Sequence, residues 1–136
     1  MKYKLLIWFA ALILSGCYCP NKKAAEPEAV VRKGAVIKVK PEKLEFYKEL
    51  HANPWPGVNN KLKECNIRNY SIYYRDGYLF SYLEYTGNDW EGDMKKLAAD
   101  STIQAWWKLT DPCQEPVGFA KEGEWWADLE EVFHQD

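Results

Sequence analysis

The stretch NYSIYYRDGYLFSYLEY, residues 69–85, decides the fold, because it has the pattern of two β-strands joined by a two-residue turn. The dipeptide Asp76-Gly77 is typical of such turns and pairs Arg75 with Tyr78. This pairing predicts the side chains on each face: Tyr70, Ile72, Tyr74, Leu79, Ser81 and Leu83 on one, and Ser71, Tyr73, Phe80 and Tyr82 on the other. Neither face is polar, so we expect helices on one face and a ligand cavity or a partner subunit on the other.

The segments on either side of the hairpin alternate between strand and helix patterns. The expected elements are a strand at 34–40, a helix opened by Pro41 that ends near His51, a helical piece from Gly57, the hairpin, helices at 89–99 and 101–109, and a strand at 129–134. The order β-α-β-β-α-β predicts an α+β fold of the ferredoxin-like type, an antiparallel four-stranded sheet with helices on one face. The bare face of such a sheet typically pairs with a second subunit.

The first residues have the pattern of an export signal. Residues 1–16 combine two early lysines with an apolar run that is too short to span a bilayer comfortably. The run ends in Leu14-Ser15-Gly16-Cys17, which resembles the lipobox of bacterial lipoproteins, so we expect lipidation at Cys17. The alternative is an ordinary signal peptide that is cut nearby, which would leave Cys17 as a free thiol. Residues 17–32 are interpreted as a flexible tether and 33–136 as one domain. The expected location is the bacterial cell envelope, with the domain attached by lipid and facing the periplasm or the exterior.

Charge and cysteine usage narrow the function classes. The formal net charge is −2, which gives no footprint for nucleic acid. Cys65 and Cys113 have neither a CxxC partner nor a histidine at metal spacing, so we expect no structural zinc site. A disulfide between these two cysteines suits an exported protein but remains an open alternative, because the sequence does not supply the geometry.

His51 is the first candidate catalytic residue, since histidine can gain or lose a proton near neutral pH and the chain contains two histidines. Its position at the end of a helix favours the charged form. Tyr47 lies one helical turn before it, which places a phenol and an imidazole side by side. The alternatives are a histidine without a role and a tyrosine that packs in the core.

The pair Trp106-Trp107 is a candidate sugar-binding feature. Consecutive helical residues point about 100° apart, so at most one tryptophan can face the core squarely. The other is available to stack on the C–H face of a sugar, although a partly exposed core tryptophan is the competing interpretation. We interpret the second pair, Trp125-Trp126, as packing.

Four separated segments together resemble the L-rhamnose mutarotase family. They are Tyr47-xxx-His51 with Asn53-Pro54-Trp55-Pro56, then Asn69-Tyr70-Ser71-Ile72-Tyr73, then Trp106-Trp107, then Glu131-Val132-Phe133. The resemblance implies a homodimeric enzyme, a dimeric α+β barrel without metal or cofactor, that interconverts the α and β anomers of a deoxyhexose. It further implies that His51 is the catalytic proton donor, and that Tyr47, Tyr70, Trp106 and Trp107 bind the monosaccharide.

Two features depart from the family pattern and keep alternatives open. The lipoprotein start is unlike the cytoplasmic members, and residues 109–126 do not map onto the best-known members, so the choice between L-rhamnose, L-fucose and related sugars stays open. One alternative is a non-catalytic lipoprotein that binds sugar on its aromatic side chains. Another is a dimeric α+β barrel oxygenase or haem-degrading protein in which His51 would bind iron.

Overall fold

The structure, a computed structural model, describes residues 30–135. The predicted signal, Cys17 and most of the predicted tether lie outside this range. The elements in chain order are β1 (Val31–Val39), η1 (Pro41–Lys43), α1 (Leu44–Ala52), α2 (Pro56–Glu64), β2 (Ile67–Arg75), β3 (Tyr78–Tyr85), α3 (Trp90–Ala99), α4 (Ser101–Thr110), η2 (Asp111–Cys113), β4 (Gln114–Glu115) and β5 (Ala127–Leu129).

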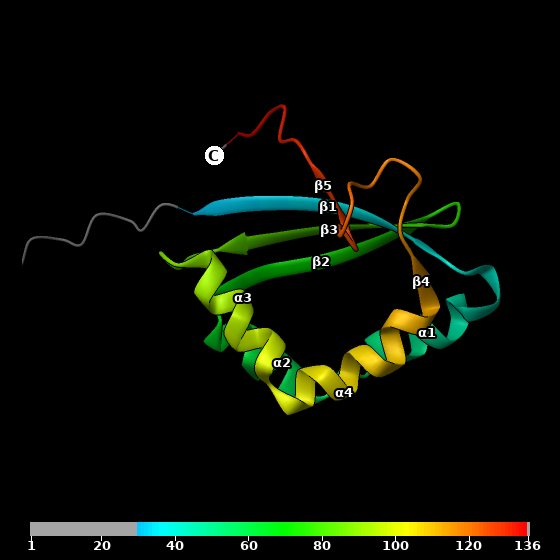
Figure 1. Cartoon of the computed structure of the whole chain (residues 1–136), viewed down its shortest axis with the longest axis horizontal. Coiled ribbons are helices and arrows are strands. Elements are labelled where there is room, and N and C mark those ends of the chain that lie inside the picture. Colours follow the sequence, from blue (N-terminus) through cyan, green and yellow to red (C-terminus); the bar gives the residue numbers. More distant parts are fainter. Residues whose placement is uncertain (1–29, 136) are drawn as a thin grey trace, which may run out of the picture.

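The strands form one antiparallel sheet in the order β2-β3-β1-β4. The short strand β5 also pairs with β1, but with an earlier part of it, residues 34–36, than β4 does. The helices all lie on one side of this sheet (Figure 1). This arrangement is the predicted ferredoxin-like α+β fold, because the first strand is central and the hairpin occupies one edge.

The predicted hairpin register is confirmed. Arg75 pairs with Tyr78 across a turn in which Asp76 and Gly77 both have positive φ, 48° and 85°. Two positive φ values at the centre of a two-residue turn match the right-handed twist of the strands. The turn therefore fixes which side chains of β2 and β3 face the helices.

A β-bulge that the sequence analysis did not predict interrupts β2 between Arg68 and Ser71, where Asn69 has φ 46°. One extra residue on β2 reverses the alternation of side chains. Ile67 and Tyr70, which a regular strand would point to opposite faces, both line the helix side of the sheet.

The core has three clusters of buried side chains: two lie between the helices and the sheet, and a smaller one, formed by Val36, Val117 and Ala127, lies on the opposite face of the sheet. The first contains Val58, Cys65, Ile67, Leu97, Ile103 and Trp106, and the second contains Ile37, Val39, Tyr47, Leu79 and Cys113. Cys65 and Cys113 therefore belong to different clusters, and both are free thiols. The disulfide alternative is wrong for this structure.

A buried carboxylate fastens α3 to the end of the sheet. Asp93 accepts hydrogen bonds from Lys96 Nζ, Asn66 Nδ2 and Tyr85 Oη, each at 2.8 Å. These donors, led by Lys96, lower the pKa of Asp93 to about 2. The carboxylate stays ionised and keeps the α2–β2 junction, β3 and α3 in a fixed relation.

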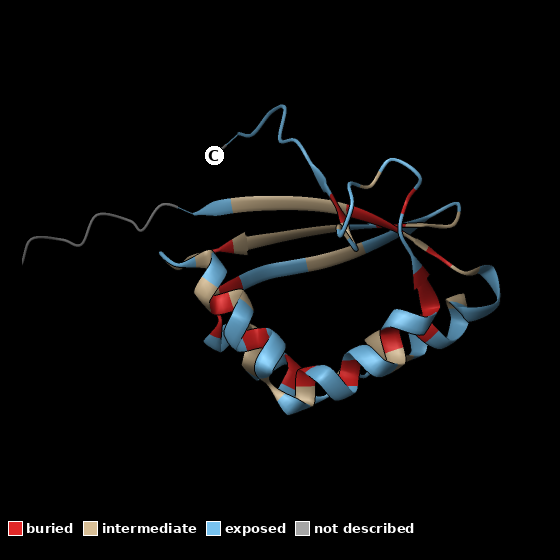
Figure 2. Cartoon of the chain, viewed as in Figure 1, coloured by how far each residue is buried: buried red, intermediate tan, exposed pale blue. Residues whose placement is uncertain are grey.

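The structure corrects the sequence analysis at both ends of the domain. Val31 and Arg32, assigned to the tether, begin β1. The last strand is Ala127–Leu129 rather than 129–134, and the segment after it is exposed along its length (Figure 2). Ala127 is small enough to pack between Val36 and Val117, so strand pairing forms there. No helix within residues 30–135 is long and apolar enough to cross a membrane.

Candidate active site

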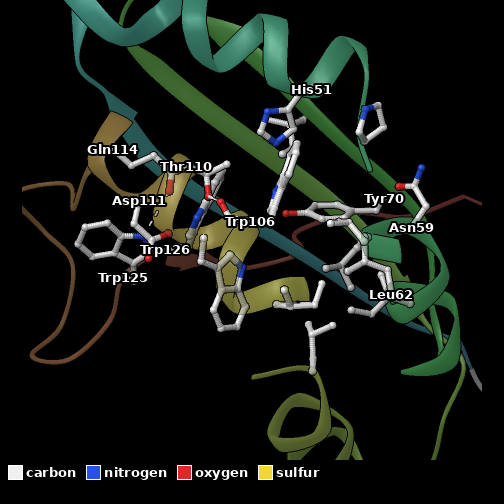
Figure 3. A pocket seen from close by; sticks show the side chains of 18 of the residues that line it. His51, Asn59, Leu62, Tyr70, Trp106, Thr110, Asp111, Gln114, Trp125 and Trp126 are labelled. Carbon is white, nitrogen blue, oxygen red and sulfur yellow. Dashed lines mark hydrogen bonds between the residues drawn. The ribbon is translucent and has the colours of Figure 1, made fainter. Parts of the chain in front are cut away.

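A cavity of about 750 Å³ lies between the sheet and the helices. This volume is within the range of about 300–1,000 Å³ that is usual for small-molecule sites. Its wall is rich in aromatic side chains that come from every layer of the fold: Tyr47, Tyr70, Trp90, Trp106, Trp107, Trp125 and Trp126. The site is therefore a concave, largely apolar pocket with a few polar groups (Figure 3).

Tyr47 and His51 lie side by side on α1, as the helical spacing predicted. Their rings stack with centroids 4.1 Å apart and an interplanar angle of 28°. Both residues line the cavity. The spacing of one helical turn thus places a phenol and an imidazole in the same pocket.

The protonation state of His51 follows from its surroundings. Its Nδ1 lies 2.9 Å from the backbone carbonyl oxygen of Tyr47, and a carbonyl oxygen only accepts hydrogen bonds. Nδ1 therefore carries a proton, which leaves Nε2 of the neutral ring as an acceptor. Burial lowers the pKa of His51, and it outweighs the opposing effect of the backbone hydrogen bond. The expectation that the helix end favours the charged form is wrong here, because burial dominates.

Tyr70 enters the cavity from the bulge in β2. Although 42% of its surface is exposed, its hydroxyl points toward His51 and Trp106 (Figure 3). Burial raises the pKa of Tyr70 to about 12, so the phenol keeps its proton near neutral pH. The pKa of Tyr47 is raised as well, mainly by burial and next by the nearby Tyr70. The site thus contains two protonated phenols beside a neutral imidazole.

The two tryptophans of α4 have different environments, as the 100° rule required. Trp106 is 6% exposed and meets the rings of His51 and Trp55 edge to face, at centroid distances of 5.3 and 5.4 Å. Trp107 is 36% exposed and also lines the cavity. Trp106 is thus a core residue that supports the imidazole, and Trp107 offers an open ring face.

Part of the segment that could not be mapped, residues 109–126, forms one wall of the cavity. Thr110, Asp111, Gln114, Trp125 and Trp126 all line it. The interpretation of Trp125-Trp126 as packing alone is therefore wrong, although Trp126 also packs against the core. The sequence carried one signal, an adjacent pair of tryptophans with no periodic partner, but it did not show which way they point.

The described part of the chain holds no cluster of three or more His, Cys, Asp or Glu side chains that is suited to a metal ion. One acidic group, Asp111, faces the cavity, and burial raises the pKa of this carboxyl. Besides the indole N–H groups, the polar side chains that line the pocket carry one imidazole, two phenols, two amides, one hydroxyl and one carboxyl.

Comparisons with known proteins agree with this geometry. The profile of the L-rhamnose mutarotase family matches residues 32–135. A protein named L-rhamnose mutarotase from Oceanobacillus iheyensis is 34% identical over 113 residues, which cover 77% of this chain and 98% of that protein. One of the same name from Bacillus subtilis is 33% identical, over 77% and 98% of the two chains. The crystal structure of an L-rhamnose mutarotase from Formosa agariphila superposes with a TM-score of 0.62 at 23% identity, over 78% of this chain and 99% of that one. The region matched by the profile contains every residue that lines the cavity.

Proposed function

Because the chain belongs to the L-rhamnose mutarotase family, we propose that it interconverts the α and β anomers of L-rhamnose or a similar deoxyhexose such as L-fucose. The protein is a carbohydrate isomerase of the mutarotase type. Family membership decides against the oxygenase alternative. The observation that carries the assignment of the site is the stacked Tyr47–His51 pair in an aromatic cavity, with Nε2 of His51 as the acceptor.

The reaction requires the anomeric hydroxyl to lose a proton and the ring oxygen to gain one while the C1–O5 bond breaks. Neutral His51 accepts the anomeric proton at Nε2, and the imidazolium so formed delivers a proton to the ring oxygen. The open-chain aldehyde then rotates about C1–C2, and the same steps in reverse close the ring on the other face. His51 thus keeps the role of proton donor that the family resemblance implies, in the step that protonates the ring oxygen.

Charge builds up on the ring oxygen between the two proton transfers, and in this proposal the two phenols stabilise it. Tyr47 and Tyr70 are both protonated and line the cavity beside His51. A hydrogen bond from either hydroxyl favours the developing oxyanion over the neutral ring oxygen, which is how such donors accelerate a reaction. No metal is needed for these steps.

The lining of the cavity suits a deoxy sugar. Leu62, Met94 and Leu97 form an apolar end of the pocket, which favours a methyl group over a hydroxymethyl group. The indole face of Trp107 is available to stack on ring C–H groups, as aromatic side chains commonly do with partly apolar ligands. This pocket lining supports a 6-deoxyhexopyranose as the substrate class.

Anomer exchange of L-rhamnose, followed by saturation-transfer NMR with the purified protein, tests this function. Exchange faster than the spontaneous rate supports it, and the same measurement with L-fucose ranks the two sugars. If neither sugar exchanges faster, the activity is absent. Saturable binding without acceleration would instead identify a sugar-binding lipoprotein.

We further propose a homodimer formed through the helix-free face of the sheet. Tyr73 pairs with Phe80, which pairs with Val36, so these side chains share the face opposite the helices. Tyr73 is 63% exposed, and Phe80 and Leu129 on the same face are also exposed. A contiguous apolar patch of this kind on a sheet is typical of a surface that another subunit covers.

Substituting Tyr73→Glu is expected to convert the dimer to a monomer, because it places an unpaired carboxylate at the centre of an apolar interface. Analytical ultracentrifugation over a concentration series measures the change. Lys95→Glu, an exposed charge on α3 on the other side of the sheet, is the matched control and leaves the mass unchanged. A wild-type protein that sediments as a monomer at all concentrations contradicts the dimer.

The lipoprotein start supports a second proposal, that Cys17 is lipidated and holds the domain at the cell envelope, facing away from the cytoplasm. A labelled fatty acid fed to expressing bacteria is expected to appear on the wild-type chain and not on Cys17→Ser. The variant should also leave the membrane fraction. Equal labelling of both chains, or no label on either, contradicts the proposal.

A further inference from the structure

A buried amide connects Tyr47 to the aromatic wall of the cavity. Gln114, the first residue of β4, is 5% exposed. Its Nε2 lies 3.3 Å from Tyr47 Oη, and its Oε1 lies 3.3 Å from Trp125 Nε1. The three side chains form one chain of hydrogen bonds along the pocket wall.

The chemistry of the three groups sets the direction of this chain. An indole N–H is only a donor, so the carbonyl end of the Gln114 amide must face Trp125. The NH₂ end then faces Tyr47 and donates to its hydroxyl oxygen, since an amide nitrogen does not accept. Tyr47 is therefore an acceptor on this side, and its own proton points elsewhere. No residue of the described range accepts that proton, which leaves the cavity as its destination.

The groups that set this direction are held rigidly. Gln114 pairs with Val39 of β1, so its backbone is part of the sheet. Trp125 lies between a turn and β5, and the turn is closed by Glu124. The Glu124 carboxylate accepts hydrogen bonds from the backbone N–H groups of Lys121, at 2.7 Å, and Asp128, at 2.9 Å. The indole is thus presented to Gln114 by an ordered turn.

We infer that Gln114 and Trp125 are positioning residues that keep the Tyr47 hydroxyl as a hydrogen-bond donor to the ring oxygen of the sugar. The inference rests on the proposed function for its catalytic meaning. Tyr47 is the residue that touches the substrate, and the amide and the indole act only through it. The direction of these hydrogen bonds is set by Gln114 and Trp125, which both belong to the segment 109–126 that could not be mapped from sequence.

The decisive substitution is Gln114→Glu, which keeps the size of the side chain and removes its donor. A carboxylate accepts from both neighbours, so the Tyr47 proton turns away from the cavity. We expect kcat to fall by about 10²–10³-fold, as when a donor to a developing oxyanion is lost, with little change in KM. Gln104→Glu, the same change at an exposed position of α4, leaves kcat unchanged.

A double-mutant cycle separates this role from a general effect on folding. In the Tyr47→Phe background, Gln114→Glu should cause no further loss of kcat, because the hydroxyl it reorients is already absent. Trp125→Phe keeps the aromatic ring but loses the N–H, and its partly exposed site tolerates the change. It should lower kcat in the wild-type background and leave kcat unchanged in the Tyr47→Phe background. Losses that multiply independently of Tyr47, or full kcat in Gln114→Glu, would overturn the inference.

A spectroscopic readout tests the inference without activity. The tyrosine Fermi doublet in ultraviolet resonance Raman spectra distinguishes a phenol that accepts a hydrogen bond from one that donates. The difference between a protein and its Tyr47→Phe form isolates Tyr47. We expect a phenol that accepts a hydrogen bond from Gln114 in the wild type and a phenol that only donates in Gln114→Glu, and the same signal in both contradicts us. A wild type without mutarotase activity would remove the proposed function, while this measurement would still decide the orientation of Tyr47.

Discussion

Replacing His51 with alanine is expected to slow anomer exchange by about 10²–10⁴-fold, which is the usual contribution of a positioned acid-base group. The imidazole is the group that accepts and returns the proton, and neither phenol can replace it, because burial raises the pKa of both Tyr47 and Tyr70. Saturation-transfer NMR of L-rhamnose measures the loss. Full activity in His51→Ala would contradict the assignment.

His134 provides the matched control for this experiment, because it is the second of two histidines in the sequence and lies in the exposed C-terminal segment. His134→Ala should exchange the anomers at the wild-type rate. Both variants should unfold at similar denaturant concentrations. A large loss of stability in His51→Ala alone would make the isosteric change His51→Gln the better probe of chemistry.

The pH dependence of kcat follows from the same histidine. The form that starts the reaction is neutral, and burial lowers the pKa of His51 below its ordinary value near 6.5. Activity therefore rises as the pH increases through this lowered pKa and is level above it. The midpoint of this rise should lie below pH 6.5. A rate that falls over this range as the pH rises would show that protonated His51 starts the reaction.

Substituting Trp106→Ala is expected to destabilise the domain by about 3–5 kcal/mol, the usual cost of removing a large aromatic side chain from a core. This cost is a large part of the total stability of about 5–15 kcal/mol that a domain of this kind has. Trp106 packs in a core cluster and edge-on against His51 and Trp55, so its loss opens a cavity beside the catalytic residue. Chemical denaturation monitored by circular dichroism measures the change.

Trp107 is the natural control, because it has the same side chain on the same helix. Trp107→Ala should cost much less stability, since 36% of this residue is exposed, and should instead raise KM for the sugar. The two neighbouring positions then separate folding from binding. Equal destabilisation by both substitutions would refute the assignment of Trp106 to the core and of Trp107 to sugar binding.

The hairpin and the helix spacing were predictable from sequence because both depend on local rules. Asp76-Gly77 sets the turn whatever surrounds it, and a separation of four residues places Tyr47 beside His51 in any α-helix. The bulge at Asn69 was not predictable, because no residue pattern distinguished it from a regular strand. The predicted register already placed Tyr70 on the same face as Ile72 and Leu83, whereas the turn of Ile67 to that face depends on the bulge and was not predictable.

Residues 109–126 could not be predicted because long-range contacts decide their course. Gln114 meets Tyr47 across 67 residues of chain, and neither its type nor its neighbours indicate this partner. The predicted position of the last strand was wrong for a related reason. The alternating pattern favoured residues 129–134, whereas tight packing of Ala127 against Val36 and Val117 sets the position of the strand. Local patterns thus predicted the elements, and packing selected their ends.

The two unbridged cysteines make this domain independent of the redox state of its surroundings. Cys65 and Cys113 are each 1% exposed, and burial raises the pKa of both thiols, which keeps them from the thiolate form that reacts with oxidants. Within residues 30–135 the fold needs no cross-link that an oxidising compartment would have to close, and its two cysteines offer no accessible thiol for an unwanted one. The same core can therefore serve equally in a reducing cell interior and in an oxidising envelope.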